Sequence, residues 1–119
     1  MGTVDYYEQL KNKMDTYVHL VYQFTKNFPK DELYGVTSQI RRASLSVILN
    51  YIEGFARKRF AVKKNFWEIS YGSLQESKYL LNFSMVENYL TKDEYDQSIK
   101  LAEEIGAMLW KAIESMRND

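Results

Sequence analysis

Positively charged side chains gather in one short part of a chain whose net charge is balanced. Residues 41 to 64 contain seven basic residues and one acidic residue, a local charge of +6, whereas the 119-residue sequence has 16 basic and 16 acidic residues in all. Such a cluster is typical of a surface that binds phosphate groups, and each phosphate contact adds to affinity and to its salt dependence. The candidate nucleic-acid-binding residues are Arg41, Arg57, Lys58, Arg59, Lys63 and Lys64.

Two interpretations of this cluster are open. Cations near the C-terminus of a helix are favourably placed against the helix dipole, so the cluster also suits an ordinary solvated helix end. Aromatic rings next to it would stack on exposed bases in a nucleic-acid-binding protein, although core packing explains such rings equally well. The flanking rings are Phe55, Phe60, Phe66 and Trp67.

A second set of polar residues lies within segments that are otherwise apolar. Steps of three and four residues place five of them on one helix face, namely Gln39, Arg42, Ser46, Asn50 and Glu53. Glu76, on the next predicted helix, is the natural partner for Arg42. Because burying a polar group without a partner costs several kcal/mol, we expect a hydrogen-bond network that fixes helix register. The alternative is a polar surface that faces a ligand.

The residue types that metal sites and most hydrolytic sites require are missing. The chain has no cysteine and one histidine, His19, with no glutamate three residues before it, so the Glu-x-x-His pair of dinuclear bundle sites is absent. His19 also has no arginine upstream, which excludes the Arg-x4-6-His motif of small helical ribonucleases. Catalysis by Glu53 with Glu76 is conceivable, but a structural pair explains these carboxylates more simply. We expect no enzyme activity, no metal and no cofactor.

The elements that must position these residues are predicted to be helices. Apolar residues recur at steps of three and four along the chain, and Pro29 ends the first such run. Thr91 and Glu94 form a capping box that begins the last one. The expected helices span about 5–27, from between 30 and 38 to 57, about 62–89, and about 91–116. No β-type alternation occurs, and short connections favour an all-α, antiparallel up-down-up-down four-helix bundle in one domain over residues 1–119.

The second predicted helix is apolar on two faces. One stripe contains Val36, Ile40, Ala43, Val47 and Gly54, and the other contains Leu45, Ile48, Leu49, Ile52 and Phe55. A helix with two apolar faces must be covered on two sides, by the bundle core and by a neighbouring subunit, so we expect a homo-oligomer. The third helix carries a stripe of small residues that should allow close approach of another helix, with members Ser70, Ser73, Ser77 and Ser84 and with Gly72 nearby.

The location of the protein is predicted from what the sequence lacks. No apolar run approaches the ~18 residues of a membrane span. The first residues, Met1 to Asp5, have no basic region and no apolar region of a secretory signal. We expect a soluble cytoplasmic protein.

A series of short motifs occupies the middle of the chain. Its members are Phe28-Pro29, Glu32, Tyr34-Gly35-Val36, Gln39-Ile40-Arg41-Arg42-Ala43, Ser46-Val47, Asn50-Tyr51-Ile52-Glu53-Gly54 and Gly72-Ser73-Leu74-Gln75-Glu76. In order and spacing these motifs resemble those of the bacterial 23S rRNA intervening-sequence protein family, whose pattern is FP-x2-E-x-YGL-x2-QIRRA-x2-SI-x2-NIAEG, followed by GS-L-x-E in the third helix. The departures are Tyr51-Ile52, where the family has Ile-Ala, and Tyr71, where it commonly has Ala.

The resemblance implies a homo-oligomeric bundle, typically a ring of five copies, without recognised catalytic residues. Some relatives are encoded inside rRNA intervening sequences. A structurally similar group serves as the accessory protein of diversity-generating retroelements, where it binds RNA and a reverse transcriptase. These relatives imply an RNA- or DNA-binding scaffold, or alternatively a protein-interaction adaptor such as an accessory subunit of a reverse transcriptase.

Overall fold

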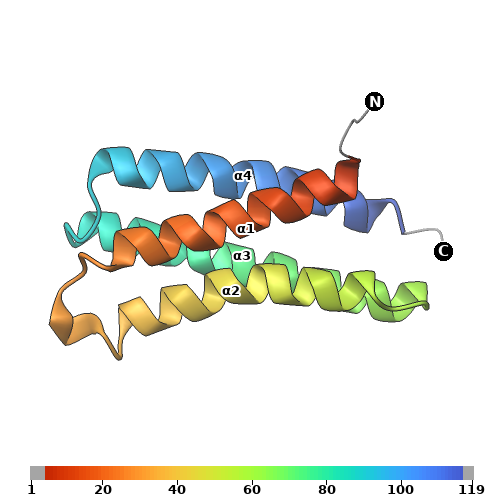
Figure 1. Cartoon of the computed structure of the whole chain (residues 1–119), viewed down its shortest axis with the longest axis horizontal. Helices are drawn as coiled ribbons and strands as arrows, with labels where there is room; N and C mark the ends of the chain where they lie inside the picture. The colour runs from red at the N-terminus through yellow and green to blue at the C-terminus, as the bar shows by residue number, and fades with distance from the viewer. Residues whose placement is uncertain (1–4, 117–119) are drawn as a thin grey trace.

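The computed structural model of the chain describes residues 5–116, which form four long helices (Figure 1). These are α1 (Tyr6–Thr25), α2 (Val36–Phe55), α3 (Phe60–Val86) and α4 (Lys92–Glu114), with one short 3-10 turn, η1 (Lys30–Glu32), between α1 and α2. No strand occurs in these residues. The predicted all-α four-helix bundle is therefore confirmed.

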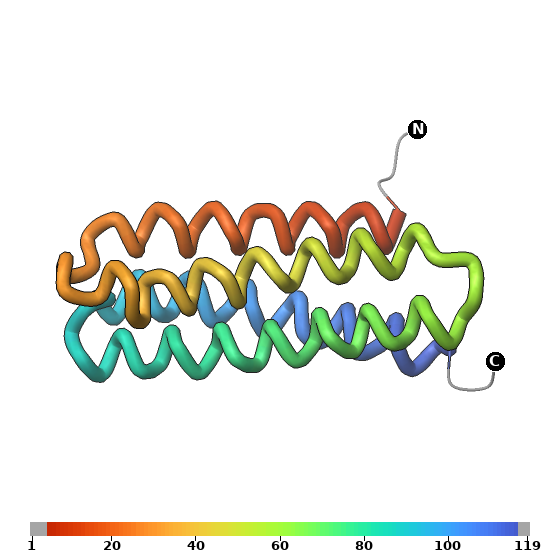
Figure 2. Tube along the Cα trace, turned by 90° about the horizontal axis from the view of Figure 1, so that it is seen from below, coloured from red at the N-terminus to blue at the C-terminus, as the bar shows by residue number. Residues whose placement is uncertain are grey.

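The four helices run in alternating directions and close into a bundle 46 Å long (Figure 2). Each helix contacts its neighbour in the sequence, and α1 also contacts α4. The α1–α2 and α3–α4 connections lie at one end of the bundle. The α2–α3 connection lies at the other end, beside the beginning of α1 and the end of α4. We call this second end the basic end, because it carries Arg57, Lys58 and Arg59.

Side chains accept hydrogen bonds from free amides at the start of three of the long helices. The Asp5 carboxylate accepts from the Glu8 amide at 2.8 Å, and the predicted capping box is present, with Thr91 and Glu94 bonded reciprocally at 3.0 and 3.1 Å. At α2, the Glu32 carboxylate accepts from the Val36 amide at 3.1 Å. Its second oxygen accepts from the Tyr89 hydroxyl at 2.9 Å, which ties η1 to the α3–α4 turn and raises the pKa of Tyr89.

Helix α3 begins about two residues earlier and ends about three residues earlier than predicted. The helix begins at Phe60, and it ends at Val86 because Asn88 adopts a left-handed conformation with φ of 66°. The Tyr89 amide then donates back to the Ser84 carbonyl at 2.8 Å. Asn tolerates this conformation better than most residues do. Hydrophobic periodicity does not reveal such a helix end, because it depends on the backbone preference of a single polar residue.

The predicted stripe of small residues on α3 lies against the neighbouring helices. Ser70, Ser77 and Ser84 are completely buried. The Ser70 hydroxyl donates to the Val47 carbonyl of α2 at 2.6 Å, and the Ser77 hydroxyl is 2.7 Å from the hydroxyl of Tyr17, which α1 buries in the core. Burial raises the pKa of the Tyr17 hydroxyl, because the low-dielectric core disfavours its charged form. Small hydroxyls therefore let the helices approach closely while every buried hydroxyl of this stripe keeps a partner.

Helix α3 packs closely against α2 at Gly54. A Cβ atom added there would lie 2.5 Å from Cδ1 of Trp67 and 3.0 Å from the Lys63 carbonyl oxygen. The Trp67 side chain is 3% exposed, and its indole N–H donates to the Tyr51 carbonyl at 3.1 Å. Gly72, which we expected beside the small-residue stripe, is instead exposed and has nothing within 4 Å of its added Cβ.

Replacing Gly54 by alanine should therefore destabilise the fold. We expect Gly54→Ala to lower the free energy of unfolding by about 1–3 kcal/mol, because the buried indole cannot move away without losing its packing. Gly72→Ala is the matched control. It should raise stability by about 0.5–1 kcal/mol through helix propensity alone. Urea denaturation at one fixed protein concentration checks both values, and equal effects of the two changes would contradict the close-contact interpretation.

Candidate nucleic-acid interface

Three cations at the basic end have no ion-pair partner within residues 5–116. Lys58 and Arg59 are exposed in the α2–α3 connection, and Lys64 is half-buried in the first turns of α3. None of the three forms an ion pair with a described residue. Their charges are therefore not neutralised within this part of the chain.

Arg57 and Lys63 are held by their neighbours. Arg57 pairs with Glu53 one turn earlier, and its guanidinium lies 5.5 Å from the centre of the Phe66 ring. The Lys63 ammonium lies 5.3 Å from the centre of the Phe55 ring and 5.7 Å from that of Trp67. A cation over an aromatic face is attracted by the ring quadrupole, so these contacts orient both side chains.

The structure places Arg41 apart from the other predicted binding residues. Arg41 lies in the second turn of α2, roughly 21 Å along the helix axis from Phe55, the last residue of the helix. Its Nε atom donates to the Thr25 hydroxyl at 2.8 Å, and its guanidinium lies 4.8 Å from the centre of the Tyr22 ring. In this structure Arg41 links α2 to α1 and is not part of the basic end. It was grouped with the other cations only because it is near them in the sequence.

The start of α3 differs electrostatically from the other helix starts. No side chain caps it, and its first turn contains no acidic residue. Arg59, Lys63 and Lys64 lie there, next to the positive end of the helix dipole, where cations are unfavourable. Only Arg57 and Lys58 follow the C-terminus of α2, where the helix dipole favours cations. That distinction depends on α3 starting at Phe60, which the sequence did not reveal.

Aromatic rings form a cluster beneath these cations. Tyr51 stacks on Trp67 with ring centres 5.2 Å apart. Tyr7 and Phe55 each contact Trp67, and their own ring centres are 5.9 Å apart. Tyr51 and Trp67 are buried, whereas Tyr7 and Phe55 are 38% and 52% exposed. Phe60, at the first position of α3, is 51% exposed. The predicted flanking rings thus divide into core residues and surface residues.

Two hollows adjoin the exposed rings. The first, of about 280 Å³, is lined by Tyr7, Phe55, Phe60, Lys63, Trp67 and Ser115, with Met116 at its edge. The second, of about 270 Å³, shares Tyr7 and Phe55 with the first but adds Asp5, Glu8 and Lys11. The charged side chains of the first hollow are thus basic, and those of the second are predominantly acidic.

The predicted polar network is only partly formed. Asn50 donates to the Ser46 carbonyl at 2.9 Å and to its hydroxyl at 2.8 Å, and that hydroxyl is 2.9 Å from the Ser73 hydroxyl of α3. Gln39, Arg42 and Glu76 are exposed and line a polar hollow of about 410 Å³ between α2 and α3. No ion pair joins Arg42 to Glu76 in residues 5–116.

The remaining candidates for chemistry lie apart from one another. Glu53 pairs with Arg57 and does not line the hollow that contains Glu76, so the two carboxylates are not brought together. His19 is exposed, 3.5 Å from Asp15. Within residues 5–116 no group of three or more His, Cys, Asp or Glu side chains is arranged to hold a metal ion.

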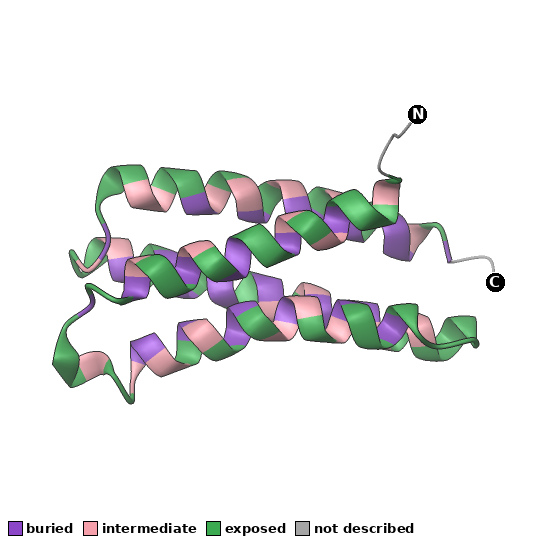
Figure 3. Ribbon diagram, viewed as in Figure 1, coloured by how far each residue is buried: buried purple, intermediate pink, exposed green. Residues whose placement is uncertain are grey.

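Four of the five residues in the predicted second apolar stripe of α2 are exposed, and Figure 3 shows exposed positions along the length of this helix. The fifth, Ile48, is half-buried and packs against the core. Leu49, Ile52 and Phe55 are 54%, 46% and 52% exposed, and Leu45 is 37% exposed. Large apolar residues exposed in a continuous row are uncommon on a surface that faces only solvent. We call this row, Leu45 to Phe55, the outer stripe of α2.

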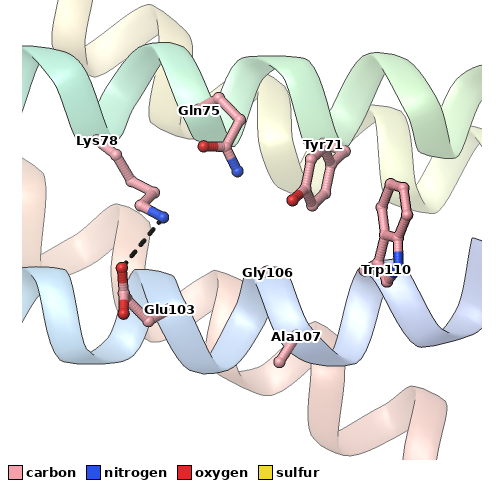
Figure 4. Close-up of a pocket in the computed structure, with 7 residues that line it drawn as sticks. All are labelled: Tyr71, Gln75, Lys78, Glu103, Gly106, Ala107 and Trp110. Carbon is pink, nitrogen blue, oxygen red and sulfur yellow. Dashed lines mark ion pairs between the residues drawn. The ribbon is translucent and has the colours of Figure 1, made fainter.

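A shallow groove on the other side of the bundle is of a different kind (Figure 4). The side chains of Tyr71 and Gln75 of α3 point toward α4, where Trp110 lies beside Tyr71 and Gly106 and Ala107 complete the lining. Lys78 and Glu103 close one end as an ion pair at 3.3 Å. The charges of this groove are thus paired with each other, unlike those at the basic end.

Comparison with known proteins places this structure in a family. The model of the 23S rRNA-intervening sequence protein family matches residues 8–111. The chain belongs to this family. A crystal structure of a protein of unknown function from the S23 ribosomal protein family of Bacteroides thetaiotaomicron VPI-5482 is similar, with a TM-score of 0.79 and 22% sequence identity over 87% of this chain and 97% of that chain. No curated protein matches the sequence.

The structure explains why two of the motif residues, Glu32 and Gly54, occur where they do. Within the FP-x2-E segment, Glu32 caps α2, and within the segment ending in Glu-Gly, Gly54 makes room for Trp67. The exposed motif residues Gln39, Arg42 and Glu76 have no such role inside the described chain.

None of the helices in residues 5–116 combines the length and the hydrophobicity that a membrane span requires.

The hydrogen bonds of Ser46 give a test of the partial network. Ser46→Ala removes contacts to Asn50 and Ser73 and should cost about 1 kcal/mol of unfolding free energy relative to Ser38→Ala. Ser38 lines the same polar hollow, but its hydroxyl has no partner within residues 5–116. Because both changes are Ser→Ala in one helix, propensity cancels. Chemical denaturation measures the difference, and indistinguishable variants would show that the Ser46–Ser73 contact does not contribute to stability.

Proposed function

We propose that this family member is a non-enzymatic, homo-oligomeric scaffold that binds structured RNA or DNA through the basic end. The observation that carries the proposal is the group of three cations, Lys58, Arg59 and Lys64, that no described acidic residue neutralises. Such cations gain most from contact with phosphates, since each contact releases condensed counterions.

The electrostatics of α3 support an anionic ligand. Cations beside the positive end of a helix dipole each cost a few tenths of a kcal/mol, and a bound phosphate would reverse the sign of that interaction. The other three long helices have a carboxylate or hydroxyl at this position, from Asp5, Glu32 and Thr91. A phosphate at the start of α3 would supply what those side chains supply elsewhere.

Assembly is the second part of the proposal. The outer stripe of α2 exposes apolar side chains that a second copy of the chain would cover, and the resemblance of the motifs favours a ring of five copies. A ring repeats the basic end around its symmetry axis. Repetition multiplies the phosphates that one assembly contacts and raises its overall affinity without any new type of contact.

The alternative is a protein-interaction adaptor, and the outer stripe is the observation that favours it. An apolar surface of this kind would equally dock a different protein, such as a reverse transcriptase, with nucleic-acid binding incidental. The two functions differ in their response to salt, because a phosphate-binding surface weakens steeply as salt rises and an apolar interface does not.

Charge reversal at the basic end tests the nucleic-acid proposal. The triple variant Lys58→Glu, Arg59→Glu and Lys64→Glu should lose most of its affinity for an RNA hairpin. The slope of log affinity against log salt should fall by about 0.9 for each phosphate that the variant no longer neutralises. Glutamates at the start of α3 favour the helix, so unfolding would not explain the weaker binding. Fluorescence anisotropy over a range of salt concentrations measures both quantities.

The control variant changes net charge by the same amount elsewhere. Lys26→Glu, Lys30→Glu and Lys100→Glu replace three exposed lysines away from the basic end, none of which has an ion-pair partner in residues 5–116. This variant should keep the wild-type salt slope. If both triple variants lose affinity equally, only net charge matters, and if neither does, the proposed interface is wrong.

Assembly is tested through the outer stripe. Leu49→Lys with Ile52→Lys should convert the oligomer to a folded monomer, because lysine ammonium groups cannot be buried in an apolar interface without a partner. Val86→Lys, at 64% exposure at the end of α3, should leave assembly unchanged. Sedimentation velocity at micromolar concentration measures the mass. A wild-type chain that sediments as a folded monomer would contradict this part of the proposal.

A further inference from the structure

The hollow between Phe55 and Phe60 combines exposed ring surface with a cation. Its walls include Tyr7 and Lys63, and the buried indole of Trp67 forms part of its lining. At about 280 Å³ it lies just below the range of pockets that hold drug-sized molecules, a size that suits one planar ring system. Two half-exposed phenylalanines and a lysine thus surround a space for a flat group.

The charges around this hollow select an occupant that is attached to an anion. Lys63 contacts the hollow directly, and Arg59 and Lys64 flank it in the sequence on the same helix start. The neighbouring hollow contains Asp5 and Glu8 and would repel an anion. A flat ring linked to phosphates is a nucleotide, and proteins that bind single strands combine aromatic stacking surfaces with a cationic path for the backbone.

We infer that this hollow binds an unpaired nucleobase, so that the protein recognises single-stranded segments of its nucleic acid through stacking as well as through phosphates. The inference rests on the proposed function and makes it more specific. In a duplex the bases are stacked on each other, and their faces are covered. Only a loop, bulge or strand end presents a base that enters a hollow of this kind.

Base-free oligonucleotides separate stacking from phosphate binding. The probes are oligothymidine of about 12 nucleotides, within the site sizes of stacking proteins, and a strand of the same length with abasic residues. Both have the same phosphates. Oligothymidine should bind about tenfold more tightly, which is the lower part of the range for one stacked base.

Phe60→Leu is the variant that tests the hollow. Phe60 is half exposed, and leucine keeps an apolar side chain while removing the ring face, so the fold should be retained and circular dichroism should confirm it. This variant should bind oligothymidine about tenfold more weakly and the abasic strand as the wild type does. Tyr34→Leu, which changes a ring of 94% exposure at the opposite end of the bundle, should affect neither probe.

A fluorescence measurement gives a second readout. The chain has two tryptophans, so Trp110→Phe leaves Trp67 at the hollow as the reporter. Oligothymidine should quench this fluorescence, and the abasic strand should not.

The outcomes distinguish this inference from the proposed function. Suppose that both strands bind and quench equally, that Phe60→Leu changes the binding of neither, and that charge reversal at the basic end abolishes binding. The inferred stacking site is then wrong, and the proposed phosphate interface remains. If neither strand binds at any salt concentration, and an RNA hairpin does not bind either, both proposals fail.

Discussion

The close approach of α2 to α3 at Gly54 is the constraint on which the basic end depends. Because Gly54 has no side chain, the Trp67 indole fits against α2 and donates to the Tyr51 carbonyl at 3.1 Å. That contact fixes the aromatic cluster, and the Phe55 and Trp67 rings in turn hold the Lys63 ammonium. A larger residue at this position would separate the helices and change the geometry of the connection that carries the free cations.

The two faces of the α2–α3 pair have different roles in the molecule. On the inner face, the buried serines of α3 donate to backbone carbonyls or contact the Tyr17 hydroxyl. The outer face exposes apolar side chains along α2 and cations at the end of this helix. Apolar surface favours assembly and cations favour phosphates, and both properties belong to one pair of packed helices. Assembly would therefore set the spacing of the phosphate-binding ends.

Hydrophobic periodicity was sufficient to predict the helices and the outer stripe, and the Thr-x-x-Glu motif was sufficient to predict the capping box at Thr91, because each depends on residues close in sequence. It failed where the outcome depends on the position of a second element. Arg41 contacts Thr25 and Tyr22 of α1, which no spacing within α2 reveals. Asn88 ends α3 through a left-handed conformation that few side chains allow. The exposed polar residues Gln39, Arg42 and Glu76 showed the same periodicity as buried ones, so the pattern predicted a larger network than the chain forms.

Amide hydrogen exchange of the protein with and without an RNA hairpin tests the central claim most directly, because it reports where the nucleic acid lies without any substitution. The proposed interface predicts slower exchange on binding in residues 56–67, at the start of α3 and the connection before it. The α3–α4 groove at Tyr71 and Trp110 should exchange at the same rate in both samples. Protection confined to that groove, or none at the start of α3 when the RNA is bound, would contradict the account.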